Sequence, residues 1–272
     1  MIELSIREEQ AIQLSLLHFF DELCKKEGYR YFLAYGTLLG AIRDNGFIDW
    51  DDDIDLWMLR EDFDKLNSRA REFSTPEYFF QNVETDIHMP VPGMLRICVN
   101  GTYKWPLECR NKKFNKGIYF DIFPLDFECN DSVENNKKAK KFLITNSIIW
   151  NKLGIKYENM SWKACLFQKI CMLVPKRILN KLGLASYPKR NLSKEKLICL
   201  PTISVYPNKK LYYDDFSSSV LHKFEDMMCP CPVGFQRILH EIYGDWETPQ
   251  KTKPRYTKAY LLDEPHQRGG IE

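Results

Sequence analysis

Residues 53–58 read Asp-Ile-Asp-Leu-Trp-Met, so acidic and apolar side chains alternate before the run becomes fully apolar. Side chains on a β-strand point alternately to its two faces. The run therefore predicts a strand with Asp53 and Asp55 on one face and Ile54 and Leu56 on the other. Two carboxylates on one face repel each other and cost stability unless they are neutralised. A divalent cation would neutralise them, and their hard oxygen atoms suit Mg²⁺, with Mn²⁺ as a second choice.

A solvated acidic turn is the competing interpretation of this run. It explains neither the apolar Ile54 and Leu56 nor the flanking Trp50 and Trp57, for which a surface loop has little use. An EF-hand also fits poorly, because a loop that starts at Asp51 has Leu56 at the sixth position, where that motif needs glycine. We therefore favour a strand that carries a metal site.

The remaining pattern of the first 130 residues is typical of a mixed α/β structure. Ser5 and Glu8 form a capping-box sequence that opens a helix, and Gly28 is placed to end it. Apolar residues then recur at helical spacing in residues 63–73. Further strands are expected at residues 31–35, 78–83, 94–99 and 118–123.

After about residue 130 the pattern changes, and basic and apolar residues recur at helical spacing. Helices are expected at residues 137–153, 162–182 and 235–243, and Pro175 must end or kink the second. The sequence thus predicts an α+β fold, with a mixed sheet and flanking helices in residues 1–130. A mainly helical region, residues 131–272, is expected to pack on that core as one globule, since the length suits a single core.

Composition and charge narrow the function. A net charge of +2 argues against a protein that binds nucleic acid through bulk charge. The chain has no signal-like start and no apolar stretch near the ~20 residues that span a bilayer, so we expect a cytoplasmic protein. The basic, amphipathic residues 162–177 could contact an anionic membrane surface. An ordinary core-facing helix with a solvated basic side is the favoured interpretation.

Two further features belong with the acidic run. Gly36 and Thr37 lie between a strand and a short expected helix, residues 38–43, where backbone N–H groups can bind a phosphate and glycine allows close approach. Asp121 is a single acid in an otherwise apolar strand and needs a partner if it is buried. That partner could be a metal shared with the acidic run, or Arg96.

These motifs closely resemble those of the LicD family, which includes bacterial cholinephosphotransferases and is related to the fukutin group. The resemblance lies in residues 31–43 and 46–55, in the Gly-x-x-x-Asp-Ile-Phe-Pro-Leu-Asp segment at residues 117–126, and in Tyr-Gly-Asp at residues 243–245, followed by Pro249. Leu95, Arg96 and Thr102 fit the strand between. Tyr35 departs from the family pattern, which often has glycine before the Gly-Thr pair.

The resemblance implies a nucleotidyltransferase fold and a Mg²⁺-dependent phosphotransferase. The donor would be CDP-linked, such as CDP-choline. The acceptor would be a sugar or polyol hydroxyl of a surface glycan precursor, lipid-linked forms included, of the kind used for lipopolysaccharide, teichoic acid or capsule. Implied roles are metal binding and catalysis for Asp53, Asp55 and Asp121, and phosphate binding for Gly36, Thr37, Arg43 and Arg96.

Two other functions remain open at this point. Glycosyltransferases also use an Asp-x-Asp pair with a metal and a nucleotide sugar, and an inactive nucleotide- or glycan-binding module would keep the same residues. The third acid and the upstream Gly-Thr pair favour phosphotransfer. A choline group would need an aromatic face, for which Tyr35, Trp50 and Trp57 are candidates, although core packing is the expected role of each.

Overall fold

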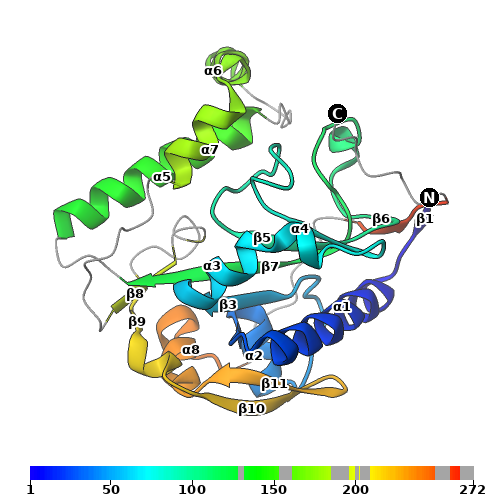
Figure 1. Ribbon diagram of the computed structural model, residues 1–272, viewed down its shortest axis with the longest axis vertical. Helices are drawn as coiled ribbons and strands as arrows, with labels where there is room; N and C mark the ends of the chain where they lie inside the picture. The colour runs from blue at the N-terminus through cyan, green and yellow to red at the C-terminus, as the bar shows by residue number, and fades with distance from the viewer. Residues whose placement is uncertain are drawn as a thin grey trace.

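The computed structural model describes residues 1–127, 132–152, 161–184, 196–199, 202, 209–248 and 258–263. Among these residues a mixed seven-stranded sheet lies at the centre, in the order β2-β3-β7-β5-β4, and β8 and β9 extend it through β7 (Figure 1). β3 and β7 are parallel and the other pairs are antiparallel. The strands are β2 (Phe32–Leu33), β3 (Asp55–Leu59), β4 (Tyr78–Gln81), β5 (Leu95–Val99), β7 (Tyr119–Phe127), β8 (Lys196–Ile198) and β9 (Leu211–Tyr212).

Helices flank this sheet, so the predicted α+β class is confirmed. The long first helix, α1, packs its apolar stripe on the sheet, and the Phe20 ring lies 5.4 Å from the Phe120 ring of β7. Shorter helices follow β2 and β3. The helices of the first half are α1 (Ile6–Glu27), α2 (Tyr35–Arg43), α3 (Arg60–Ser68) and α4 (Ala70–Phe73), with a 3₁₀ turn at Leu107–Cys109.

The start and end of α1 are as predicted. The Ser5 hydroxyl accepts a hydrogen bond from the Glu8 backbone N–H, and the Glu8 carboxylate accepts one from the Ser5 N–H. Gly28 ends the helix with φ +73°, a left-handed conformation that glycine adopts without steric cost. The capping box therefore fixes where the helix begins relative to the sheet.

The second half contains the expected helices and also strands that the sequence analysis did not predict. Pro175 separates α6 from α7, as expected. The helices are α5 (Ser132–Lys152), α6 (Trp162–Leu173), α7 (Lys176–Leu184) and α8 (Phe235–Tyr243), with a 3₁₀ turn at Tyr213–Phe216. The added strands, besides β8 and β9, are β10 (Ser219–Phe224) and β11 (Met227–Pro232), which form a hairpin, and β12 (Tyr260–Leu261).

The two halves of the chain pair with each other. β12 lies between β1 (Ile2–Glu3) and β6 (Thr102–Tyr103), so the two ends of the described chain are neighbours (Figure 1). Helices α6 and α7 pack on α5, and the three lie together at the upper left of the view in Figure 1. The boundary near residue 130 stays a prediction, because β8 and β12 of the second half pair with strands of the first.

The favoured interpretation of residues 162–177 as a core-facing helix is wrong. The inner face of α6 buries Gln168 and Cys171, whereas Trp162 and Leu173 are 72% and 83% exposed. Leu166, Phe167 and Ile170 are exposed as well. The apolar side of the helix thus faces outward. None of the helices in the described part of the chain is both long and apolar enough to cross a membrane.

Candidate active site

The site begins at the register between β3 and β7. Asp55 is the first residue of β3 and lies directly opposite Asp121 of β7 in the parallel pair. Asp53 precedes β3 by two residues, and all three acids are partly buried. Ile54 and Leu56 are fully buried in the core. The predicted division into an acidic and an apolar face is confirmed, and the third acid lies on the strand next to the first two.

A fourth carboxylate, that of Asp51, was not predicted to belong here. It lies before the strand, in a turn closed by a 2.9 Å hydrogen bond from its N–H to the Ile48 carbonyl oxygen. This turn places the Asp51 side chain against Gly36, where an added Cβ would overlap the carboxylate. The alternation of side chains along a strand could not predict the contact between Asp51 and Gly36, because Asp51 lies in a turn and the turn sets the direction of its side chain.

Burial and neighbouring carboxylates disfavour the charged forms of Asp51, Asp53 and Asp55. Burial raises the pKa of Asp55 well above its ordinary value, and Asp53, Asp121 and Asp51 raise it further, while Lys104 opposes them. Burial and Asp53 also raise the pKa of Asp51 to about 8. The pKa of Asp53 is raised mainly by burial, against the charge of Lys104. The cluster therefore carries more negative charge than its surroundings neutralise.

Lys104 provides the counter-charge within the protein, and the sequence analysis missed it. Its ammonium is 5% exposed, pairs with Glu9 at 2.9 Å and donates to the backbone carbonyl of Asp52. Burial lowers the pKa of Lys104, but nearby Tyr119, Glu9, Asp53 and Asp52 outweigh that effect, so the pKa is raised overall. Lys104 follows β6 directly. It stays charged beside the acids and partly offsets their repulsion.

The N-terminal part of α1 holds the acidic loop in place. The Gln10 side-chain amide donates to the Asp51 carbonyl oxygen at 2.7 Å, and the Gln13 amide donates to the Asp52 carbonyl oxygen at 2.6 Å. Both glutamines are buried. Buried amides without partners would be costly, so these polar residues explain why the inner face of α1 is not apolar along its whole length.

Asp121 has a protein partner, as one of the two earlier interpretations proposed. The Arg96 guanidinium donates through Nε and Nη2 to the two Asp121 oxygens at 2.7 and 2.9 Å. Arg96 is buried, and its guanidinium lies 3.5 Å from the centroid of the Tyr119 ring. Its third nitrogen, Nη1, is buried without a hydrogen-bond partner among the described residues. A buried donor without a partner is costly unless a ligand or water oxygen satisfies it.

Gly36 and Thr37 lie in the first turn of α2, which starts at Tyr35, three residues earlier than predicted. The Thr37 hydroxyl accepts a 2.9 Å hydrogen bond from the Asp55 backbone N–H and so fixes the start of β3. Tyr35 has φ +44°, which is strained for a residue with a side chain. Glycine would adopt this conformation freely, which gives a physical reason for the glycine that the resembled family often has there.

Arg43 and the aromatic candidates make contacts other than with the acids. Arg43 is at the far end of α2, about 10 Å along the axis from Gly36, and its guanidinium is hydrogen-bonded to Asp44. Tyr35 and Trp57 are buried and pack on each other with ring centroids 4.7 Å apart. Trp50 is partly buried against the core. Core packing is therefore the role that the structure gives Tyr35 and Trp57.

The arrangement suits a cation held by a pair of carboxylates rather than a closed cage. In the part of the chain that the structure describes, no group of three or more histidine, cysteine, aspartate or glutamate side chains is arranged to hold a metal ion. Asp53 lies close enough to Asp55 to raise the pKa of Asp55. Such a pair fits Mg²⁺, which keeps several waters and shares substrate phosphates. Asp121 as a third ligand stays a prediction.

The chain is similar in sequence to known proteins. Residues 28–152 match the family described as LicD/FKTN/FKRP, nucleotidyltransferase domain. The whole chain is similar to the lipopolysaccharide cholinephosphotransferase LicD of Haemophilus influenzae, at 26% identity over 96% of this chain and 100% of that protein.

These matches support the resemblance to the LicD family that the sequence motifs indicate. The matched domain contains Gly36, the acidic residues of the 51–55 run, Lys104 and Asp121, so the residues predicted to bind metal and phosphate all lie inside it. Shorter matches link the chain to uncharacterised proteins of Rickettsia typhi, at 41% identity over 21% of this chain and 19% of that protein, and of Rickettsia prowazekii, at 46% over 27% and 28%. The LicD-family segment at residues 243–245 ends α8, whereas Pro249 lies outside the described residues.

Proposed function

We propose that this protein is a Mg²⁺-dependent phosphotransferase of the LicD family. It would move a phosphocholine-like group from a CDP-linked donor to a hydroxyl of a cell-surface glycan precursor, with lipopolysaccharide as the first acceptor class to test. The proposal rests on the carboxylates of Asp53 and Asp55, which lie beside Asp121 and whose negative charge the protein only partly neutralises. They lie in a region that is similar to a lipopolysaccharide cholinephosphotransferase. Donor identity, metal and acceptor are all part of the proposal.

Asp53 and Asp55 would hold the cation, with Mn²⁺ as a substitute. When bound, Mg²⁺ would neutralise charge on the donor phosphates and on the departing CMP. In the reaction, an acceptor oxygen forms a bond to the phosphorus that carries the alcohol. The bond from that phosphorus to the bridging oxygen breaks, CMP leaves, and the hydroxyl proton passes to a base. Phosphoryl transfer of this kind depends mostly on positioning and charge.

Other residues of the site would position the two substrates. The free Nη1 donor of Arg96 is suited to a donor phosphate oxygen, while its other two nitrogens keep Asp121 in place. Asp121 would hold the acceptor hydroxyl as a hydrogen-bond acceptor or base. Gly36 and Thr37 lie in the first turn of α2, with the Asp51 carboxylate packed against Gly36, and the backbone N–H groups of this turn would bind a donor phosphate.

The transferred alcohol is proposed to be choline, with ethanolamine, glycerol and ribitol as the other members of the class. A quaternary ammonium is stabilised by about 0.5–2 kcal/mol on an aromatic face. Tyr35 and Trp57 are committed to the core, which leaves Trp50 as the partly exposed candidate near the acids. Trp50→Leu would then raise the KM for CDP-choline more than the KM for CDP-glycerol.

The test is to incubate the purified protein with Mg²⁺, a panel of CDP-linked donors and a dephosphorylated glycan acceptor. The proposal predicts CMP release with phosphorus retained on the acceptor, measured by chromatography and ³¹P NMR. Omitting Mg²⁺ or adding a chelator should abolish the signal. Transfer of a sugar from a nucleotide sugar, without phosphorus, would instead support a glycosyltransferase. No turnover with any donor, despite nucleotide binding, would support an inactive binding module.

A peripheral contact with the membrane is also proposed. The outward apolar side chains of α6, Trp162, Leu166 and Leu173, are accompanied by Lys163 and Lys169 on the same helix. Apolar and basic side chains together are typical of helices that lie in the interface of an anionic bilayer. Such a contact would bring the enzyme close to a lipid-linked acceptor.

Sedimentation with phosphatidylglycerol vesicles tests this contact. The wild-type protein should sediment with these vesicles and Leu166→Glu should not. Leu221→Glu, which changes a leucine of similar exposure on β10, is the matched control and should behave like wild type. Equal sedimentation of all three proteins, or of none, would count against the proposed contact.

A further inference from the structure

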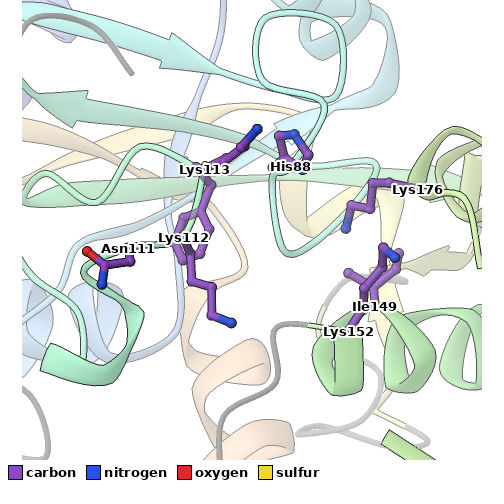
Figure 2. A pocket seen from close by; sticks show the side chains of 8 residues that line it. His88, Asn111, Lys112, Lys113, Ile149, Lys152 and Lys176 are labelled. Carbon is purple, nitrogen blue, oxygen red and sulfur yellow. The ribbon is translucent and has the colours of Figure 1, made fainter. Parts of the chain in front are cut away.

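A second candidate site is formed by basic side chains, away from the acids. A cavity of about 190 Å³ lies between helices α5 and α7 and two loops of the first half. In Figure 2, Lys112 and Lys113 extend from one side, Lys152 and Lys176 lie opposite, and His88 lies between them. The remaining lining residues are Asn111, Phe114 and Ile149.

The four lysines come from three separate segments and lack carboxylate partners. Lys112 and Lys113 belong to the loop before β7, Lys152 is the last residue of α5, and Lys176 is the first residue of α7. None of them has an ion pair within 4.0 Å in the described part of the chain. The Lys152 ammonium donates to the Met172 carbonyl oxygen at 2.5 Å, which leaves it two further N–H donors.

Asp86 is an acidic group whose charge acts on His88 and Lys176, and its oxygens already accept hydrogen bonds from other groups. One oxygen accepts from the His88 backbone N–H at 2.9 Å, and the other accepts from the Gln81 side chain and the Asn115 backbone N–H. Asp86 therefore fixes the loop that carries His88. It opposes the positive charge of the pocket without forming an ion pair in it.

Burial and neighbouring cations disfavour the charged forms of Lys176 and His88 in this pocket. Burial lowers the pKa of Lys176 to about 7, and Lys152 adds to that effect while Asp86 opposes it. Burial also lowers the pKa of His88, and Lys113, Lys176 and Lys152 act in the same direction. An anion in the cavity would reverse this repulsion, because an opposite charge favours the charged form of each base.

The pocket is separated from the acidic site by aromatic side chains. The Phe114 ring packs on the Trp105 ring, with centroids 4.6 Å apart. Trp105 in turn lies 5.8 Å from the guanidinium of Arg96, which holds Asp121. The pocket is therefore a neighbour of the proposed catalytic residues but shares none of them.

We propose that His88, Lys112, Lys113, Lys152 and Lys176 form a binding site for an anion that carries phosphate groups. Four flexible ammonium groups and an imidazole around a cavity of this size suit a pyrophosphate-like group, which offers oxygens on several sides. Such a group can belong to a free anion or to a lipid-linked phosphate. The proposal does not depend on the proposed transferase activity, since it concerns binding alone.

Calorimetric titration with inorganic pyrophosphate tests the site. The titration should be done without divalent cations, so that the acids bind no metal–pyrophosphate complex, and below pH 7, where Lys176 is protonated. The double variant Lys112→Gln/Lys113→Gln alters a surface loop and should fold. Loss of two charge-assisted contacts should weaken binding at least ~10-fold. The matched control is Lys140→Gln/Lys141→Gln, the same charge change at exposed positions on α5.

A second titration distinguishes a free phosphate-containing anion from a lipid-linked phosphate as the ligand of the pocket. Short-chain phosphatidylglycerol, used below the concentration at which it forms micelles, is titrated against the same three proteins. Selective loss of pyrophosphate binding in the pocket variant supports a free anion, and selective loss of lipid binding supports a lipid-linked phosphate. Equal affinity of the pocket variant and the control for both probes, or no binding by the wild-type protein, would overturn the proposal.

Discussion

Replacing Asp55 by asparagine separates the catalytic role of this residue from its effect on stability. The change keeps the shape of the side chain and removes its charge. The backbone N–H of residue 55 still donates to the Thr37 hydroxyl, so the start of β3 is retained. Asp53 would be left as a single carboxylate, which binds Mg²⁺ more weakly. Turnover should fall at least ~100-fold, the effect of removing one electrostatic group from an active site, or about 2.7 kcal/mol in the barrier.

The same substitution should stabilise the metal-free protein. Burial, Asp53, Asp121 and Asp51 all raise the pKa of Asp55, so its ionised form costs stability at neutral pH. Each pKa unit corresponds to about 1.4 kcal/mol, and partial exposure of the site reduces that figure. A gain of about 1 kcal/mol is expected for Asp55→Asn, which raises Tm by about 2–4 °C in a chain of this size.

The assay combines steady-state release of CMP with thermal unfolding in the presence of a chelator. Asp49→Asn is the matched control, because Asp49 belongs to the same acidic run but its side chain is 84% exposed and pairs with Arg7. The control should keep normal turnover and normal Tm. Near-normal turnover of Asp55→Asn would refute the assigned site. A clear loss of stability in the metal-free variant would refute the electrostatic reasoning.

Three further predictions follow from the same site. Folding raises the pKa of Asp51 from 3.8 to about 8. In the metal-free protein, protonated Asp51 therefore contributes its full stabilisation below pH ~4, and this contribution is lost as the pH rises towards 8. Urea titrations across this range should show that loss, and Mg²⁺ should reduce it. Lys104→Met should cost about 3–5 kcal/mol by leaving Glu9 buried and uncompensated, whereas Lys258→Met, at an exposed surface pair, should cost under ~1 kcal/mol in the same urea assay. Gly36→Ala should cost about 1–3 kcal/mol, because its Cβ meets the Asp51 carboxylate; equal stability and turnover in the variant would contradict that contact.

Local signals in the sequence predicted most of the first half of the fold. The capping box at Ser5 and Glu8 and the ending glycine, Gly28, fixed α1 because both act within one helical turn. The alternation around Ile54 and Leu56 predicted β3 because strand parity follows directly from the residue order. Such features need no knowledge of distant parts of the chain.

The residues that the sequence analysis missed act over long distances. Lys104 lies about fifty positions from the acids it faces, and only the fold brings them together. Gln10 and Gln13 interrupt the apolar stripe of α1, which was a signal that this face meets a polar partner. Asp51 was passed over because its direction depends on a turn rather than on strand parity.

The second half was harder to predict because its strands are short or unusual in composition. β11 runs from Met227 to Pro232 and contains two prolines, which normally argue against a strand. Among the described strands it pairs only with β10, so its prolines can lie where no ladder hydrogen bond is needed. The helix α6 was predicted, but its apolar side was wrongly expected to face the core. Helical periodicity shows that a helix has an apolar side and does not show what that side faces.

The central claim is that Asp53 and Asp55 together hold a divalent cation. The most direct measurement is anomalous diffraction from crystals of the protein soaked with Mn²⁺. We predict one strong anomalous peak about 2.0–2.2 Å from a carboxylate oxygen of each residue, the distance range for small divalent ions. A map with no peak between these two carboxylates, from crystals that contain Mn²⁺ elsewhere on the protein, would contradict the assignment.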